Sequence, residues 1–177
     1  KFMNNLKYSN LVLINLIIAS IIPFLIWGPF FPDLIVSVSS LLFLYYLLKK
    51  NNFYYFNKKP FIIFLTFCII SSLLSLESKD ISLSIKSSLF YFRIGVFSCF
   101  IWYLIDKDKN ILSYFYYALI LCFSALVIDG YIQYLTGTNL AGFKIINNRV
   151  SSFFGDELIM GSYLSRLFPL LFALFLI

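Results

Sequence analysis

Apolar residues occur in this chain as long runs rather than at the alternating or striped spacing of a soluble domain. Five complete runs, and a sixth that reaches the end of the chain, each approach the roughly 20 residues with which a helix crosses a bilayer. They cover residues 11–27, 34–48, 60–76, 87–105 and 111–128, and the sixth opens at Leu158. The pattern predicts an all-α, polytopic transmembrane helix bundle of about six membrane helices.

The composition excludes an ordinary soluble domain. The chain is 61% hydrophobic and only 12% charged, with a mean hydropathy of +0.90, whereas soluble domains are about half apolar and a quarter charged. We expect residues 1–177 to form a single transmembrane domain. Because the chain begins at Lys1 and ends at Ile177 inside an apolar run, we also expect it to be the truncated N-terminal part of a longer protein.

The lysines predict the orientation, because short loops that are rich in lysine stay on the cytoplasmic side. Three segments of one side carry Lys1, Lys7, Lys49, Lys50, Lys58, Lys59, Lys107 and Lys109, and the other side carries only Lys79, Lys86 and Lys144. The N-terminus is therefore predicted to be cytoplasmic, in a bacterial inner membrane. Residues 129–157 are then predicted to form an extracytoplasmic loop, which is long enough to contain a short interfacial helix. The net charge of +6 is explained by these lysines and gives no support to nucleic-acid binding.

The three arginines, Arg93, Arg149 and Arg166, all lie outside the predicted cytoplasmic loops. An arginine at the centre of a spanning helix costs roughly 2.5–3.5 kcal/mol, so such residues usually face a polar interior or a cavity. A guanidinium also suits a diphosphate or carboxylate, since it keeps its charge and offers a planar fork of donors. The alternative is that Arg93 and Arg166 reach lipid headgroups or pair with Asp156, Glu157 or Glu77.

The stretch from residue 129 to 169 carries a recognisable pattern. It contains Asp129, Gly130, Tyr131, Gln133 and Tyr134, then Gly137, Thr138, Asn139 and Gly142, then RVSSFFGDE at 149–157, and then Gly161, Tyr163, Leu164 and Pro169. This pattern resembles the O-antigen ligase and O-antigen polymerase family of bacterial surface-polysaccharide enzymes. The resemblance is good over 129–169 and only general over the earlier helices. Ser152 departs from it, because the family most often has glycine there.

The resemblance implies transfer of a glycan from an undecaprenyl-diphosphate-linked donor to a lipid or glycan acceptor at the periplasmic face, without nucleotide sugar, required metal or other cofactor. Arg149, Arg93 and Arg166 would converge on the diphosphate, within a site that also meets membrane lipids. Ser151, Gly142 and Gly155 would set the loop geometry. The family's proposed catalytic histidine has no counterpart, as the chain contains no histidine, so this chain would hold only the first part of the site.

The catalytic residues are unknown, and Asp156 and Glu157 are the weak candidates. They could orient the arginines or activate an acceptor hydroxyl, but acidic residues before a helix are ordinary capping residues, which is the interpretation we favour. Cys68, Cys99 and Cys122 have no metal-like spacing and are interpreted as packing residues. Two other functional classes remain open. A secondary transporter would use the arginines as an anion site but predicts repeats with broken helices, and a non-catalytic membrane subunit would leave the 149–157 motif unexplained.

Overall fold

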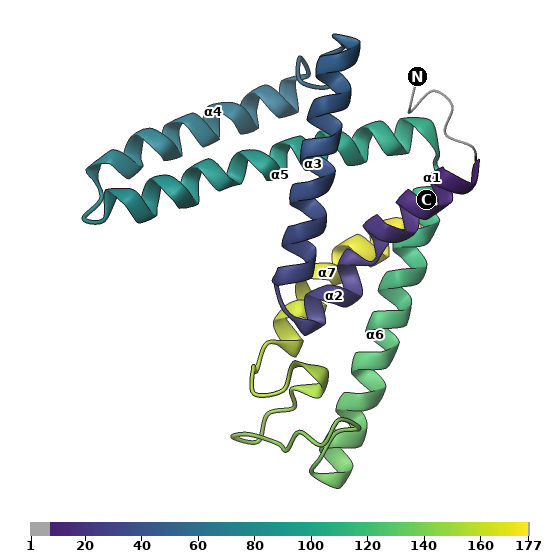
Figure 1. Ribbon diagram of the computed structural model, residues 1–177. Coiled ribbons are helices and arrows are strands. Elements are labelled where there is room, and N and C mark those ends of the chain that lie inside the picture. The colour runs from purple at the N-terminus through teal and green to yellow at the C-terminus, as the bar shows by residue number, and fades with distance from the viewer. Residues whose placement is uncertain (1–7, 177) are drawn as a thin grey trace. The chain divides into compact units, whose positions relative to one another are not determined.

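The computed structural model describes residues 8–176, which fold into helices, short connections and one long loop. Lys1, Lys7 and Ile177 lie outside the described residues. Figure 1 shows α1 (Tyr8–Ala19), α2 (Ile21–Trp27), α3 (Phe30–Lys50), α4 (Lys59–Leu74), η1 (Ser75–Glu77), α5 (Ile81–Lys107), α6 (Asn110–Thr136), η2 (Ser152–Phe154) and α7 (Met160–Phe175). Within residues 8–176 the only β pairing is two isolated bridges. The prediction of an all-α protein is confirmed.

Four helices of the described chain are long and apolar enough to cross a membrane. They are Phe30–Lys50, Lys59–Glu77, Ile81–Lys107 and Asn110–Thr136. Their apolar side chains point outward: Ile63 on α4 is 71% exposed and Leu121 on α6 is 68% exposed. Such a surface is unfavourable in water and suits the hydrocarbon of a bilayer. The four helices indicate a multi-pass membrane protein.

The first and last of the six expected spans are shorter. Residues 11–27 are divided between α1 and α2 at Ser20. Pro23 causes the division, because it has no N–H to donate to the carbonyl of Ala19, although the Phe24 N–H still bonds the Ser20 carbonyl at 3.1 Å. The helix α7 has 16 residues and contains Pro169. Both segments are apolar, but each falls short of the length of the other four.

Within the described residues, one compact unit consists of residues 8–32 and 109–176 and is arranged around α6. The helices α1, α2 and α7 each contact α6 (Figure 1). Ile22 of α2 is buried with Leu119 and Cys122 of α6, and Leu167 of α7 packs against them. The Tyr163 hydroxyl donates a hydrogen bond of 2.9 Å to the Ile22 carbonyl. The start of α7 is therefore fixed to α2 by a polar contact as well as by apolar packing.

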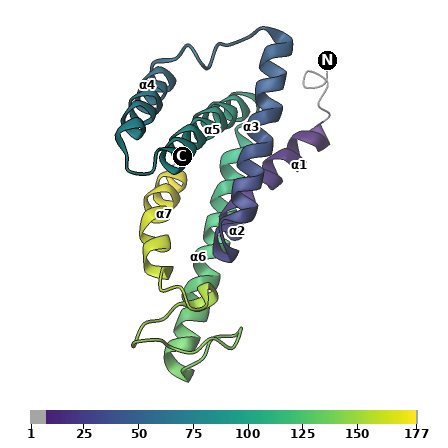
Figure 2. The ribbon, with the colours of Figure 1, turned by 60° about the vertical axis from the view of Figure 1, so that its left-hand side comes forward.

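The second unit consists of residues 33–108. In it α4 and α5 lie side by side (Figure 2). They approach closely because Gly95 of α5 has no side chain where the Phe64 ring of α4 lies. The helix α3 packs on α5 through Phe43, whose ring centroid lies 5.3 Å from that of Phe100 and 5.6 Å from that of Tyr103. Aromatic side chains thus form much of the interior of this unit.

The close approach at Gly95 gives a testable prediction. In a Gly95→Ala variant the new Cβ would lie 2.5 Å from a Phe64 ring carbon. We therefore expect the free energy of unfolding to fall by about 1–3 kcal/mol. The matched control is Gly161→Ala on α7, where nothing lies within 4 Å of the added Cβ and helix propensity alone favours alanine by roughly 1 kcal/mol. The measurement is thermal unfolding of both purified variants in detergent. Equal unfolding midpoints would contradict the packing described.

Candidate functional site

The long loop begins later than the sequence indicated. The helix α6 continues to Thr136 and is capped by Gly137, which has a φ of +82° and whose N–H bonds the Gln133 carbonyl at 2.9 Å. Residues 129–136, expected at the start of the loop, are therefore helical. The irregular segment runs from Gly137 to Ile159 and contains the short helix η2.

Five buried polar residues hold this loop against the last two turns of α6, and we call them the loop clamp. They are Asp129, Gln133, Asn139, Ser151 and Ser152. Each is at most 5% exposed. Polar groups buried to this degree are stable only when they are hydrogen-bonded, so their partners define the loop's conformation.

Asp129 accepts hydrogen bonds from three residues in two parts of the loop. The Ser152 hydroxyl donates to its Oδ2 at 2.6 Å, the Leu140 N–H donates to its Oδ1 at 2.9 Å, and the Asn139 amide donates to Oδ2 at 3.3 Å. Hydrogen bonds to a carboxylate contribute about 1.5–3 kcal/mol each. A single side chain on α6 therefore joins the two ends of the loop.

Gln133 lies one helical turn after Asp129 and bonds the same loop segments. Its Oε1 accepts from the N–H groups of Ser151 at 3.0 Å and Ser152 at 2.8 Å, and its Nε2 donates to the Phe143 carbonyl at 3.2 Å. Asn139 adds a bond of 2.8 Å from its amide to the Ser152 carbonyl. This role was not predicted from the sequence, where the available signal is the i, i+4 spacing of Asp129 and Gln133, which places both on one helix face.

Ser152 has a backbone conformation that favours glycine. Its φ is +51°, in the left-handed region, which costs a residue with a Cβ about 1–2 kcal/mol. This is the position at which the sequence departs from the expected glycine. The hydroxyl that glycine lacks makes the 2.6 Å bond to Asp129, which offsets the backbone strain.

The predicted glycine positions of the loop also have positive φ. The φ of Gly142 is +89° and that of Gly155 is +63°. A Cβ added at Gly155 would lie 3.3 Å from the Phe143 ring. Ser151 contributes its buried N–H to Gln133. These three residues shape the loop and carry no charge for a ligand.

Arg149 stands directly after a tight two-residue turn. Asn147 and Asn148 have φ values of +50° and +57°, and two successive positive φ values are what a type I′ turn requires. The Arg149 N–H closes the turn on the Ile146 carbonyl at 2.9 Å. Its side chain is exposed and has no hydrogen bond or ion pair to any residue in 8–176. The turn fixes the backbone while the guanidinium stays available.

Arg93 is paired within its own helical unit. Its Nη2 lies 2.9 Å from the Asp33 Oδ2, and its Nη1 donates to the Ser37 hydroxyl at 2.9 Å. Asp33 was not among the partners expected from the sequence. Because α5 begins at Ile81, Arg93 is the thirteenth of 27 residues, about 18 Å along the helix at 1.5 Å per residue.

Arg93 therefore belongs to the unit of residues 33–108, whereas Arg149 and Arg166 belong to the unit that contains the loop clamp. Arg166 lies on α7, six residues after Met160, and is exposed. Among residues 8–176 it has no ion pair. Of the three arginines, only Arg149 extends from a segment that the loop clamp fixes.

Asp156 and Glu157 do not cap α7, and the interpretation that we favoured for them is wrong. The cap residue is Ile159 and the helix begins at Met160. The turn at Gly155 and the irregular residues after it keep both carboxylates outside the first helical turn. Both side chains are exposed, and neither pairs with an arginine in the described chain.

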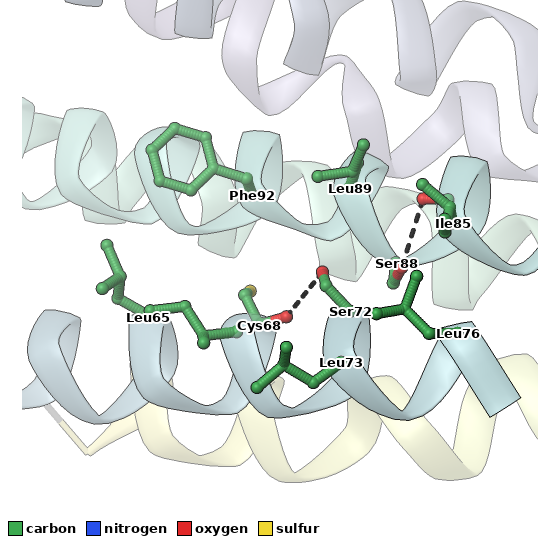
Figure 3. Close-up of a pocket in the computed structure, with 10 residues that line it drawn as sticks. Leu65, Cys68, Ser72, Leu73, Leu76, Ile85, Ser88, Leu89 and Phe92 are labelled. Carbon is green, nitrogen blue, oxygen red and sulfur yellow. Dashed lines mark hydrogen bonds between the residues drawn. The ribbon is translucent and has the colours of Figure 1, made fainter.

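A cleft of about 510 Å³ lies between α4 and α5 and offers little for chemistry (Figure 3). Its walls are apolar except for Cys68, Ser72 and Ser88. The Ser72 hydroxyl bonds the Cys68 carbonyl at 2.8 Å, and the Ser88 hydroxyl bonds the Ser84 carbonyl at 3.0 Å. All three cysteines are buried and free, as expected of packing residues. Residues 8–176 contain no group of acidic residues and cysteines that could hold a metal ion.

Comparisons of the chain with family models, with curated proteins and with solved structures find no match. The case for a function therefore depends on the loop clamp and on the residues that it presents.

The loop clamp predicts that two substitutions at Ser152 differ in their effect on stability. Ser152→Ala removes the hydroxyl bond to Asp129 and keeps the strained φ, whereas Ser152→Gly removes the same bond but relieves the strain. We expect the alanine variant to be less stable than the glycine variant by about 1 kcal/mol. Hydrogen exchange of residues 137–157 measures this as faster exchange in the alanine variant. Identical protection in the two variants would contradict the left-handed conformation.

Proposed function

We propose that this chain forms part of a membrane glycosyltransferase of the O-antigen ligase and polymerase type. It would act at the outer face of a bacterial inner membrane and transfer a glycan from an undecaprenyl-diphosphate-linked donor to a lipid or glycan acceptor. One observation carries the proposal: Arg149 is exposed and unpaired within residues 8–176, on a turn that buried hydrogen bonds hold in place.

The chemistry of the donor explains why such an arginine is useful. When the bond between the anomeric carbon and the diphosphate breaks, negative charge develops on the departing diphosphate. A fixed guanidinium stabilises that charge more than it stabilises the intact donor, and such preorganised donors lower the barrier by about 3–4 kcal/mol. The loop clamp supplies the rigidity, because it fixes the backbone on both sides of the turn that carries Arg149.

Two further features support the proposal. The backbone of Ser152 is glycine-like, at the position where the resembled family most often has glycine. The carboxylates of Asp156 and Glu157 are exposed and uncommitted within the described chain, which keeps them available to accept the proton of an acceptor hydroxyl.

Arg93 contributes less to this proposal. Its two terminal nitrogens already contact Asp33 and Ser37, so a diphosphate would have to displace the Asp33 carboxylate. Arg93 lies in the middle of the apolar helix α5 and its partner Asp33 in the first turn of α3, and a charged residue within a membrane-length helix is also typical of ion and substrate pathways. This pair is the observation that favours the alternative of a secondary transporter for an anionic substrate.

Substitution of Arg149 tests the proposal in the full-length protein in its native membrane. We expect Arg149→Ala to reduce surface glycan about 100-fold or more. We expect Arg149→Lys to produce only part of the normal amount of surface glycan, because lysine has no bidentate fork of donors. The control is Lys144→Ala, which removes another exposed cation of the same loop. The readout is surface glycan normalised to membrane protein level. Normal glycan from Arg149→Ala at normal protein level would exclude the role, and retained glycan with lost anion uptake would favour the transporter.

The predicted orientation is tested separately by cysteine labelling. Ala141 in the long loop and Asn57 before α4 are both exposed, and three long apolar helices separate them. We expect a membrane-impermeant maleimide to label Ala141→Cys on intact inner-membrane vesicles of native orientation, and to label Asn57→Cys only after permeabilisation. The native cysteines are buried in helices and serve as the unlabelled background. Equal labelling of both sites before permeabilisation would contradict the topology.

A further inference from the structure

Four tyrosines gather where α3 ends, α4 begins and α5 ends, all within residues 33–108. We call them the tyrosine cluster: Tyr46, Tyr54, Tyr55 and Tyr103. The ring centroids of Tyr46 and Tyr103 are 5.7 Å apart, those of Tyr55 and Tyr103 5.9 Å, and those of Tyr54 and Tyr55 5.2 Å. Such contacts between offset or edge-on rings are favourable. The cluster is therefore a packed structural element rather than a set of separate side chains.

A hydrogen bond fixes the cluster to α5. The Tyr55 hydroxyl donates to the Asp106 carboxylate at 2.9 Å. Burial raises the pKa of the Tyr55 phenol, and the hydrogen bond to Asp106 raises it further, so the phenol stays protonated as a donor. The bond also occupies one of the two carboxylates at this end of the unit.

Three lysines lie over rings of the cluster. The ammonium of Lys58 is 3.9 Å from the Tyr54 ring centroid, that of Lys50 is 5.0 Å from the Tyr46 centroid, and that of Lys107 is 5.8 Å from the Tyr103 centroid. Cation–π contacts restrict where a lysine points but do not neutralise its charge. With Lys49 and Lys59, the segments that meet here carry five lysines and only two carboxylates, those of Asp106 and Asp108. The end of the unit remains cationic.

An apolar groove begins beside the cluster. Its volume is about 250 Å³, and it runs between α4 and α5 with walls that include Pro60, Phe61, Phe64, Ser98 and Trp102. The Trp102 ring also contacts the Tyr55 ring, with centroids 5.8 Å apart. The groove and the cationic end therefore share a wall. Cations next to an apolar groove on membrane-length helices match the two parts of a lipid.

We propose that this place binds an anionic glycerophospholipid of the adjacent leaflet. The phosphate lies among Lys50, Lys58 and Lys107, and one acyl chain lies in the groove beside Trp102. Lysines that set membrane orientation need only be near a helix end, whereas these three lie over rings of the tyrosine cluster, which Trp102 joins to the groove. The site is independent of the glycosyl transfer proposed above.

Titration of the purified full-length protein with phosphatidylglycerol tests the headgroup site, with bound lipid counted by native mass spectrometry. We expect the variant Lys50→Gln, Lys58→Gln, Lys107→Gln to bind about 100-fold more weakly, at roughly fivefold for each lysine. The matched control, Lys79→Gln, Lys86→Gln, Lys144→Gln, removes the same charge elsewhere and should bind as the unaltered protein does. Detergent solution exposes both ends of the protein, so a changed insertion topology does not affect the result.

The groove is tested by filling it. Ser98 is an exposed residue of α5 that lines the groove, and in Ser98→Phe we expect phosphatidylglycerol binding to weaken roughly tenfold by exclusion of the acyl chain. The control is Ser87→Phe on the same helix, since Ser87 is also exposed and its hydroxyl likewise bonds a carbonyl four residues earlier. Binding of glycerol 3-phosphate should be equal in the two variants.

Three results would overturn the site. They are unchanged binding by the Lys50, Lys58, Lys107 variant, an equal loss in the lysine control, and equal affinity for phosphatidylcholine and phosphatidylglycerol. If Ser98→Phe binds phosphatidylglycerol as the unaltered protein does, the acyl chain does not lie in the groove, and that part of the proposal is overturned. If the Ser98→Phe protein does not fold, Ser98→Leu is used in its place, and we expect it to bind phosphatidylglycerol more weakly as well.

Discussion

The buried carboxylate of Asp129 is the contact on which the arrangement of the long loop depends. The loop is rich in glycine, asparagine and serine, and ordering such a flexible segment costs conformational entropy that other interactions must offset. Hydrogen bonds to one fixed acceptor provide the missing stabilisation. Asp129 is 1% exposed and receives three of them. An unsatisfied charge at that position would be strongly destabilising, so loop and helix end form together.

The polar residues of this loop consequently fall into two classes. Those of the loop clamp are buried, bonded to one another, and unable to contact a ligand without breaking the loop. Arg149, Lys144, Asp156 and Glu157 are exposed. This division places charges of both signs on a segment whose backbone is already ordered. A ligand that binds there meets less of the entropic cost that an unstructured loop would impose.

The apolar runs were sufficient to predict the helices, because a bilayer demands both length and continuous hydrophobicity. The ends were harder to predict. Asp129 and Gly130 resemble the stop signals of a helix, yet α6 continues because the loop folds back to bond Asp129, and Gly130 has no side chain where Met160 packs. The partner of Arg93 could not be predicted, since Asp33 is 60 residues away in sequence. The division of residues 11–27 at Ser20 was not predicted, although the N–H that Pro23 lacks is sufficient to explain it.

The same reasoning explains how far the candidate site could be foreseen. The motif around Arg149 indicated this segment as the candidate site, but it did not show that Asn147 and Asn148 supply the two positive φ values that fix the backbone there. The assignment of Asp156 and Glu157 as caps failed because capping depends on where the helix starts, and Gly155 turns the chain before that point. Composition indicates which charges are present, whereas backbone geometry decides which of them remain available. The type of cation at each place is therefore informative. The planar guanidinium of an arginine benefits from the fixed backbone of the turn. The compact ammonium of a lysine, on its flexible side chain, suits a lipid headgroup that diffuses in the bilayer.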